Sequence, residues 1–326
     1  MVIKLRAIGD VVLSTVVLDS LRKSFPHSNI DFLTEKYCKD VLFENPNLNS
    51  VLTYDSRNDN GLSLIYKIRR RRYDLVIDLF GNPRSALVTF FSGSRYRVGY
   101  RFGWRRYCYN IVVNPRGGEV HNTEFNLDAL RAISIPIINP VPQFFVTQKE
   151  IDFAHDFFKS ANLESNKVIA INPGGGWYTK RWLISHYARI SDIIMEKYKA
   201  KILLLWGPGE ENYVREIIKV MKNQAVQIPA TNLKQLAAIL QKCSLIVTND
   251  SGPMHIAAAV GVPVVAIFGP TNPALQGPVG TKTAVIQNKE LDCLGCNLTK
   301  CPIGNPCMEK LTVEEVLKGV ELLLRD

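Results

Sequence analysis

Residues Leu245–Pro273 read LIVTNDSGPMHIAAAVGVPVVAIFGPTNP and indicate how the second half of the chain folds. Leu245–Thr248 is an apolar, β-branched run typical of a buried parallel strand. A polar turn follows, and then a small apolar helix over Pro253–Val260, which Gly261 can end in the left-handed conformation. A second apolar strand over Pro263–Phe268 completes one βαβ unit. The stretch therefore predicts an open parallel sheet covered by helices.

The polar turn of this unit lies where such a sheet binds ligands. Ligands of open α/β sheets lie outside the carboxyl ends of the strands, and a helix N-terminus offers free N–H groups to an anion. Asp250 would repel a bare phosphate, but its carboxylate can accept hydrogen bonds from neighbouring sugar hydroxyls. Ser251, Gly252 and His255 face the same edge. The alternative is that the turn only caps the helix and that His255 is a structural residue.

Length and composition predict a globular protein of two domains. The chain has 326 residues, about twice a typical domain, with 46% hydrophobic and 21% charged residues. Lys and Arg number 40 against 30 acidic residues, a net charge of +10. Residues 1–150 hold 21 basic and 14 acidic residues, and residues 151–326 hold 19 and 16, so most of the excess (+7 of +10) lies in the first half. Such a field favours phosphates, anionic lipid or nucleic acid as partners.

The N-terminal sequence and the length of the apolar runs favour a cytoplasmic protein. We see no signal-peptide pattern and no apolar run of the ~20 residues that a membrane span needs. In that compartment the seven cysteines are expected to be thiols or metal ligands rather than disulfides. Cys293, Cys296, Cys301 and Cys307 could close on a structural zinc ion, although their spacing is not a standard pair of knuckles. Free thiols are the alternative.

The first half alternates strands and helices, which predicts a doubly wound parallel sheet. The first strand leads through Arg6–Asp10 into a helix over Val11–Ser24. This turn lacks the G-x-G-x-x-G pattern, so we do not expect a nicotinamide or flavin cofactor. Further strands are expected at Ile30–Leu33, Val51–Tyr54 and Leu75–Leu79, with helices at Lys36–Glu44 and Leu62–Arg72.

Arg95–Tyr109 reads RYRVGYRFGWRRYCY and interleaves arginines with aromatic residues. Arginine forks suit phosphate or carboxylate groups, and aromatic faces suit sugar rings, a membrane interface or single-stranded nucleic acid. The alternative is a solvated hairpin with ordinary surface charge. The run Arg69–Arg72 is interpreted as solvated surface at a helix end. The proline-rich segment Ile135–Val146 is the best linker candidate.

The second half repeats the alternation. The strand Val168–Asn172 ends in a glycine run that includes Gly175 and Gly176, whose N–H groups can close round a diphosphate that Lys180 neutralises. The run is not a P-loop. Further on, Glu210 and Glu211 open a helix, where they either favour its dipole or hold ribose hydroxyls. A C-terminal helix over Thr312–Arg325 starts with a capping-box pair, Thr312 and Glu315.

Taken in order, several motifs resemble those of the family 9 glycosyltransferases, the ADP-heptose:lipopolysaccharide heptosyltransferases. The matching residues are Ile8-Gly9-Asp10-Val11-Val12, Arg97-Val98-Gly99-Tyr100, His121, Asn172-Pro173-Gly174, Lys180-Arg181-Trp182, Asp250-Ser251-Gly252-Pro253-Met254-His255 and Phe268-Gly269-Pro270-Thr271-Asn272-Pro273. The cysteine-rich segment ending Cys307-Met308 is also similar to that of many members. The resemblance extends over nearly the whole chain.

The resemblance implies an α/β GT-B fold, with two Rossmann-like doubly wound parallel-sheet domains facing across a cleft. Residues 1–150 would bind the acceptor and residues 151–326 the nucleotide sugar, with the C-terminal helix 312–326 able to pack back on the first domain. The implied activity is inverting transfer of heptose from ADP-heptose to the lipopolysaccharide inner core. The protein would be peripheral on the cytoplasmic face of the inner membrane, touching an anionic membrane surface transiently, with no nucleic-acid partner and no cofactor required for the chemistry.

The resemblance also implies roles for individual residues. Asp10 would be the general base, and Lys180 with the N–H groups of Gly175 and Gly176 would stabilise the leaving diphosphate. Asp250 would bind heptose hydroxyls. The other implied donor-site residues are Thr179, Glu210 or Glu211, Ser251, Gly252 and His255, and the implied acceptor-site residues are Gly9, Arg97, Arg101, Arg105 and His121.

Alternatives remain open at this point. Asp10 can instead cap the first helix. The enzyme can belong to the same family but use another nucleotide sugar or acceptor, or it can be a GT-B sugar-nucleotide epimerase or hydrolase. A further alternative is a protein that binds nucleotide sugars or nucleic acid without catalysing a reaction.

Overall fold

The computed structural model describes residues 1–325, so Asp326, the last residue of the expected C-terminal helix, lies outside the described residues. The chain divides into two compact units, Met1–Phe145 and Val146–Asp326. Residues 135–147, which include the proline-rich segment, contain no helix or strand.

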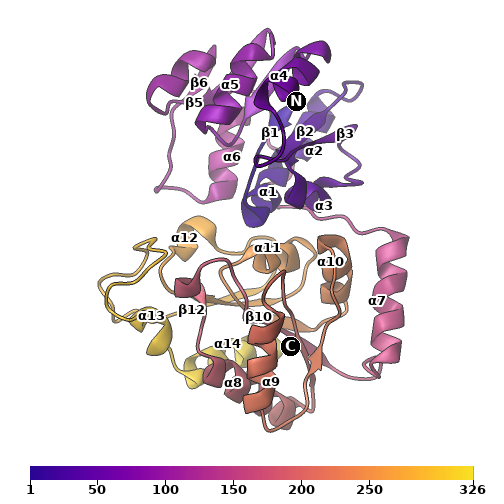
Figure 1. Ribbon diagram of the computed structural model, residues 1–326, viewed down its shortest axis with the longest axis vertical. Helices are drawn as coiled ribbons and strands as arrows, with labels where there is room; N and C mark the ends of the chain where they lie inside the picture. Colours follow the sequence, from indigo (N-terminus) through magenta and orange to yellow (C-terminus); the bar gives the residue numbers. More distant parts are fainter. Residues whose placement is uncertain (326) are drawn as a thin grey trace. The chain divides into compact units, whose positions relative to one another are not determined.

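The first unit is a six-stranded parallel sheet (Figure 1). The strand order is β3 (Ser50–Tyr54), β2 (Asp31–Glu35), β1 (Val2–Ile3), β4 (Leu75–Asp78), β5 (Tyr96–Tyr100), β6 (Ile111–Val113). The chain reverses its direction of winding at β1, so the gap between β1 and β4 is the topological switch point, where α/β sheets bind ligands.

Helices cover both faces of this sheet. They are α1 (Ile8–Ser14), η1 (Thr15–Val17), α2 (Leu18–Ser24), η2 (Lys36–Cys38), α3 (Lys39–Leu42), α4 (Gly61–Arg70), α5 (Pro83–Phe91), η3 (Gly103–Cys108) and α6 (Asn122–Arg131). Because parallel crossovers are right-handed, reversing the winding at β1 moves the connections to the other face. Accordingly, α6 packs on α1 and η1, whereas α4 packs on α5.

Two expectations for this unit need correction. The helix expected at Val11–Ser24 begins at Ile8 and is interrupted by the 3-10 turn η1, so Gly9 and Asp10 belong to its first turn. The hairpin alternative for Arg95–Tyr109 is wrong, because β5 and β6 pair in parallel and the chain between them forms η3. A tight hairpin joins antiparallel strands, whereas parallel strands need a longer connection that carries the chain back to the end of the sheet where the first strand began.

The second unit is also a six-stranded parallel sheet with helices packed on it (Figure 1). Its strand order shows that the winding likewise reverses. The order is β12 (Thr283–Gln287), β11 (Val264–Phe268), β10 (Leu245–Asn249), β7 (Val168–Asn172), β8 (Lys201–Leu204), β9 (Val226–Gln227). Its helices are α7 (Gln148–Ser160), η4 (Tyr178–Lys180), α8 (Ile184–Tyr198), α9 (Glu211–Val220), α10 (Leu233–Gln241), α11 (Gly252–Ala259), α12 (Pro273–Gln276), α13 (Pro306–Glu309) and α14 (Val313–Leu324). The switch point lies between β7 and β10.

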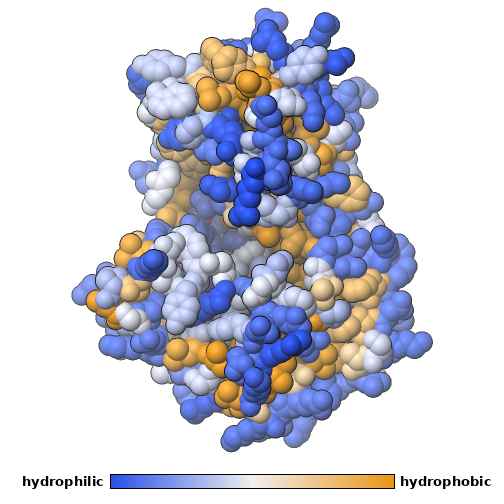
Figure 2. Space-filling view, in the orientation of Figure 1, coloured by the Kyte–Doolittle hydropathy of each residue, from blue (hydrophilic) through white to orange (hydrophobic). Residues whose placement is uncertain are grey.

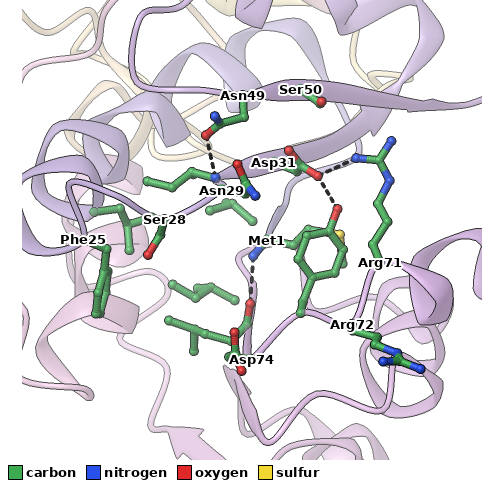
Figure 3. A pocket seen from close by; sticks show the side chains of 16 residues that line it. Met1, Phe25, Ser28, Asn29, Asp31, Asn49, Ser50, Arg71, Arg72 and Asp74 are labelled. Carbon is green, nitrogen blue, oxygen red and sulfur yellow. Dashed lines mark hydrogen bonds and ion pairs between the residues drawn. The ribbon is translucent and has the colours of Figure 1, made fainter.

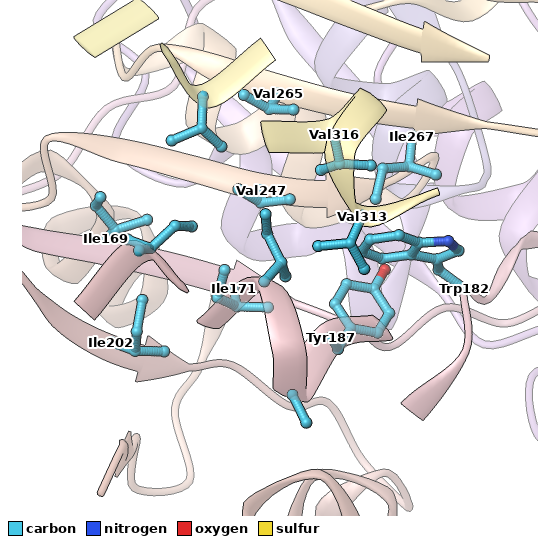
Figure 4. Packing of buried hydrophobic residues seen from close by; sticks show 14 of the residues in the cluster. Ile169, Ile171, Trp182, Tyr187, Ile202, Val247, Val265, Ile267, Val313 and Val316 are labelled. Atoms are coloured by element: carbon cyan, nitrogen blue, oxygen red, sulfur yellow. The ribbon is translucent and has the colours of Figure 1, made fainter. Parts of the chain in front are cut away.

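A core of aliphatic and aromatic side chains holds α8 and α14 against the second sheet (Figure 4). Trp182 is 1% exposed and donates its indole N–H to the Leu311 carbonyl at 2.9 Å. A Cβ at Gly319 would come within 2.9 Å of Ile286, so glycine lets α14 lie close to β12. Thr312 and Glu315 form the expected capping box at the start of α14, which packs on β10, β11, β12 and α8 of this unit.

The βαβ unit of Leu245–Pro273 forms as expected, and Gly261 ends α11 at φ +84°. Its turn differs in one respect: Ser251 is the N-cap of α11, but its side chain makes no capping hydrogen bond. The polar side chains of the turn bind other loops instead. Within residues 1–325, no helix is long and apolar enough to cross a lipid bilayer.

Candidate active site

In the second unit, polar residues end the two strands that flank the switch point. Asn172 ends β7 and lies opposite Thr248 of β10. Its amide donates to the Thr248 hydroxyl and to the Ser251 hydroxyl, both at 2.9 Å. These bonds tie the loop after β7 to the start of α11, so the two loops form one ligand-facing edge.

Lys180 and Asp250 form an ion pair at this edge. The Lys180 Nζ lies 2.6 Å from the Asp250 Oδ2, and the side chains are 15% and 6% exposed. The Thr271 hydroxyl donates to the same oxygen at 2.8 Å, and Nζ lies 4.4 Å from the centre of the Trp177 ring. A charge pair this well covered is held in a fixed geometry. It places an ammonium group, suited to a diphosphate, beside a carboxylate suited to sugar hydroxyls.

Glu210 shapes the glycine loop that follows β7. Its Oε1 accepts the N–H of Gly175 at 2.7 Å, and its Oε2 accepts the N–H of Gly207 at 3.0 Å. Arg181 donates to the Gly175 carbonyl through Nε and a terminal nitrogen, at 3.0 and 2.8 Å. A Cβ at Gly174 would lie 2.1 Å from the Glu210 carboxylate, so only glycine permits this approach. The carboxylate of Glu210 therefore binds the protein's own loop backbone.

Glu211, the alternative to Glu210, lies on the surface. It pairs with Arg215 one turn along α9 at 2.6 Å, and its side chain is 41% exposed. Between the two acids, Glu210 is the one at the ligand-facing edge.

The remaining predicted donor-site residues occupy the same edge or its support. The Thr179 hydroxyl donates to the Leu298 carbonyl at 2.8 Å, and the Asn249 amide donates to the Lys180 carbonyl at 3.1 Å. His255 is buried within α11, and Gly176 is exposed in the loop before η4. The bond from Thr179 links the site to the cysteine-rich segment, a contact 119 residues apart in sequence.

Within residues 1–325, the cysteines of that segment form no disulfide. Cys293 and Cys296 are exposed and Cys307 is buried. Burial, together with the neighbouring Cys293 and Cys296, raises the pKa of the Cys307 thiol to about 11. Within residues 1–325, no group of three or more His, Cys, Asp or Glu side chains is arranged to hold a metal ion.

In the first unit, Asp10 lies in the first turn of α1, at the carboxyl edge of the sheet. Its Oδ2 accepts the N–H of Ala7 at 3.1 Å. The N-cap is Ala7, so the capping alternative is correct only in a modified form: Asp10 binds the first turn from the third helical position. Its side chain is half-buried.

A buried lysine that interacts electrostatically with Asp10 was not predicted from the sequence. Lys4 follows β1 and donates from Nζ to the Leu79 carbonyl at 3.1 Å. Burial lowers the pKa of Lys4, and the negative charges of Asp10 and Asp78 oppose that shift. Asp78 is fully buried and accepts the Tyr109 hydroxyl at 2.7 Å, while burial raises its pKa. Lys4 thus lies close enough to Asp10 for the two side chains to interact electrostatically.

The predicted acceptor residues are only partly brought together. Arg101 follows β5 and His121 is the N-cap of α6, with its Nδ1 accepting the Thr123 N–H at 3.2 Å. Arg105 donates to the Phe102 carbonyl at 3.1 Å. Arg97, in contrast, lies near the start of β5, where its guanidinium donates to the carbonyls of Ser94 and Cys108. It therefore lies away from the edge that carries Gly9 and Asp10.

A cavity of about 730 Å³ opens at the other edge of the first sheet, among the amino ends of its strands (Figure 3). Asp31 points into it and binds Arg71 at 2.7 Å and the Tyr73 hydroxyl. None of the predicted site residues lines this cavity.

Two solved structures with the same architecture are glycosyltransferases. A family 9 glycosyltransferase from Veillonella parvula superposes with a TM-score of 0.88 and 26% identity, covering 99% of this chain and 96% of that one. The E. coli ADP-heptose lps heptosyltransferase II superposes with a TM-score of 0.81 at 24% identity, over 99% and 98% of the two chains. The two doubly wound sheets thus define a GT-B glycosyltransferase fold.

Sequence comparison identifies the family. The profile of Glycosyltransferase family 9 (heptosyltransferase) matches residues 62–306. Lipooligosaccharide heptosyltransferase 2 of Haemophilus ducreyi is 28% identical over 312 residues, covering 86% of each chain, and lipopolysaccharide heptosyltransferase 2 of E. coli is 26% identical over 304 residues, covering 86% and 85%. The chain belongs to glycosyltransferase family 9, as the motifs predicted, and is a glycosyl-transferring enzyme.

Proposed function

We propose that the protein transfers heptose from ADP-heptose to the inner core of lipopolysaccharide, with inversion at the sugar carbon. The observation that carries the proposal is the Lys180–Asp250 pair at the switch point of the second sheet. The Lys180 ammonium, a group that suits a diphosphate, lies 2.6 Å from the Asp250 carboxylate, a group that suits sugar hydroxyls. Relatives of similar length are named as heptosyltransferases of lipopolysaccharide or lipooligosaccharide, which supports this choice of sugar and acceptor.

The proposed chemistry divides between the two units. Asp10 removes the proton from the attacking acceptor hydroxyl, and the oxygen displaces ADP from the sugar carbon in one step. Lys180 and the N–H groups near Gly175 and Gly176 stabilise the charge that develops on the leaving diphosphate. Asp250 orients the heptose through its hydroxyls. No metal or cofactor takes part in this proposal, and Glu210 acts by holding the glycine loop in place.

Other predicted residues belong to the proposed donor site of the second unit and to the proposed acceptor site of the first unit. Ser251, Gly252, His255 and Thr179 line or support the donor side. Gly9, Arg101, Arg105 and His121 lie on the acceptor side, where arginines suit the phosphates and carboxylates of an inner core. The enzyme would work at the cytoplasmic face of the inner membrane, where a lipid-linked acceptor is presented.

The test is acceptor-dependent release of ADP from ADP-heptose, using truncated lipopolysaccharide cores of defined length. We expect release with one core and little with the others. ADP release that is equally fast without any core would contradict transfer and indicate hydrolysis. Conversion of the nucleotide sugar without release of ADP would indicate an epimerase, and tight binding of another nucleotide sugar with no turnover of ADP-heptose would rule out the proposed donor.

A further inference from the structure

Helix α5 is apolar on its inner and its outer side. Ala86 and Val88 are buried against the rest of the first unit. Leu87, Phe90 and Phe91, spaced three and four residues apart, share the other side and are 40%, 46% and 44% exposed. A surface helix normally carries polar residues on that side, and a contiguous exposed apolar face marks an interaction surface.

Helix α4 extends this apolar face. It packs on α5, and its Leu62 and Tyr66, one turn apart, are 75% and 62% exposed. Tyr96, at the start of β5, is 43% exposed. We call Leu62, Tyr66, Leu87, Phe90, Phe91 and Tyr96 the α4–α5 patch. Figure 2 shows apolar side chains gathered over these two helices, with strongly hydrophilic side chains beside them.

Arginines border the patch. The guanidinium carbon of Arg70 lies 5.7 Å from the Tyr66 ring centre, and that of Arg95 lies 5.2 Å from the Tyr96 ring centre. Arg69 reaches across to the end of α5, where a Cβ at Gly93 would meet its guanidinium carbon at 3.9 Å. Apolar side chains with cations at their edge can enter a bilayer interface while the charged groups stay with the lipid phosphates.

The surrounding sequence carries almost no negative charge. Residues 60–73 contain five basic residues and residues 79–118 contain seven arginines, and neither range contains an aspartate or glutamate. Between them lie Asp74 and the fully buried Asp78. Arg71 and Arg116 of these ranges pair with Asp31 and Asp128. The ion pairs of residues 1–325 include none of Arg69, Arg70 and Arg95, which border the patch, so the charge beside the patch favours an anionic partner.

We propose that the α4–α5 patch docks the enzyme on an anionic lipid bilayer. Leu87, Phe90 and Phe91 enter the headgroup region, and Arg69 and Arg70 bind lipid phosphates. The proposal rests on the proposed function in one respect, because an enzyme that glycosylates a lipid-linked acceptor must reach the bilayer. The patch combines exposed apolar side chains with arginines that have no acidic partner in the described part of the chain, and a lipid bilayer matches both features. A protein partner would have to supply acidic residues for these arginines. A nucleic acid would bind the arginines but would offer no apolar surface to Leu87.

The test is co-sedimentation of the full chain with lipid vesicles. Vesicles of phosphatidylcholine are compared with vesicles that also contain phosphatidylglycerol. Wild type is expected to bind the anionic vesicles and to dissociate as salt is raised. Phe90→Ser/Phe91→Ser and Arg69→Glu/Arg70→Glu are each expected to weaken this binding by about tenfold or more. The matched controls, Leu322→Ser and Lys219→Glu on exposed positions of the second unit, are expected to bind like wild type.

Separate readouts distinguish this proposal from the proposed function. With a water-soluble core oligosaccharide both double variants should transfer heptose like wild type, whereas with the acceptor embedded in vesicles their transfer should fall together with their vesicle binding. Thermal unfolding confirms that each variant is folded. If the protein bound vesicles through the patch but transferred no heptose, the docking proposal would stand and only the proposed function would be contradicted. Vesicle binding that neither double variant changes, or patch substitutions that alter only dimerisation or RNA binding, would overturn the proposal.

Discussion

The Lys180 ammonium lies 2.6 Å from the Asp250 carboxylate, although 70 residues separate the two in sequence. The pair forms because β7 and β10 are neighbours in the second sheet, so the loops that follow them meet. Removing one member of a covered pair leaves the other charge without its partner.

Lys180→Met tests whether this pair does more than stabilise the fold. We expect the free energy of unfolding to fall by about 3 kcal/mol, because Asp250 is left unpaired. Transfer should fall by about 10²–10³ in kcat/KM, because the leaving diphosphate loses its cation. The double variant Lys180→Met/Asp250→Asn should regain most of the stability and none of the activity. Stability is measured by urea unfolding and activity by ADP release. If the double variant recovered both stability and activity, the pair would be only structural.

Asp10→Asn tests the general base. The amide oxygen can still accept the Ala7 N–H, so the first turn of α1 should be preserved. We expect kcat to fall by about 10²–10⁴ because an amide cannot take the acceptor proton. Binding of the ADP-sugar, measured by calorimetry, should be nearly unchanged, since the donor residues lie in the other unit. Asp152→Asn, at an exposed site of α7, is the control; loss of donor affinity in Asp10→Asn would contradict the assignment.

Glu210→Gln and Glu211→Gln separate the two adjacent acids. Glu210 accepts backbone N–H groups on both carboxylate oxygens, and a glutamine can accept only one of them. The other N–H is left unsatisfied, so we expect a loss of about 1–3 kcal/mol in stability and a raised KM for the donor. Glu211→Gln removes one surface ion pair and should change stability by less than about 0.5 kcal/mol. If the two substitutions changed the KM for the donor equally, Glu210 would not be the residue that shapes the glycine loop.

The sequence was sufficient for elements whose pattern is local. The βαβ unit of Leu245–Pro273, the capping box of Thr312 and Glu315 and the parallel alternation all follow from periodicity and turn chemistry. Helix α5 was missed because its apolar residues lie all round it, so no helical stripe marks it. The family itself was recognisable from motifs that the strand ends carry.

The parts of the site that could not be predicted depend on contacts between distant segments. Lys4 reads as an ordinary strand residue, and only the packing of β4 beside β1 shows that it is buried close to Asp10. The choice between Glu210 and Glu211 depends on one residue of helix register, which decides whether a side chain faces Gly174 or solvent. Thr271 belongs to the motif Phe268–Pro273, but its hydrogen bond to Asp250 forms only because β10 and β11 are neighbours in the sheet.

The thiols should differ in reactivity. Cys293 and Cys296 are exposed, whereas burial raises the pKa of Cys307 to about 11 and that of Cys243 to about 12. Because the thiolate is the nucleophile, we expect Cys293 and Cys296 to react first with iodoacetamide and Cys307 and Cys243 only after unfolding. Mass spectrometry of the labelled peptides at successive times gives the order. Slow labelling of Cys293 and Cys296 that a chelator accelerates would instead show that the segment binds a metal.

His186 should make the protein less stable in mild acid. It lies on α8 with its ring 5.0 Å from Trp182, and its Nδ1 is buried without a hydrogen-bond partner among residues 1–325. Burial, together with Arg189, lowers its pKa below the ordinary 6.5. In the window between the lowered value and about 6.5, the unfolded chain therefore binds more protons than the folded one, so the free energy of unfolding must fall as the pH falls. Urea unfolding from about pH 7.5 to 5.5 should show this loss in wild type and a smaller loss in His186→Gln, where no proton can bind. Identical curves for wild type and His186→Gln would assign the loss to other groups.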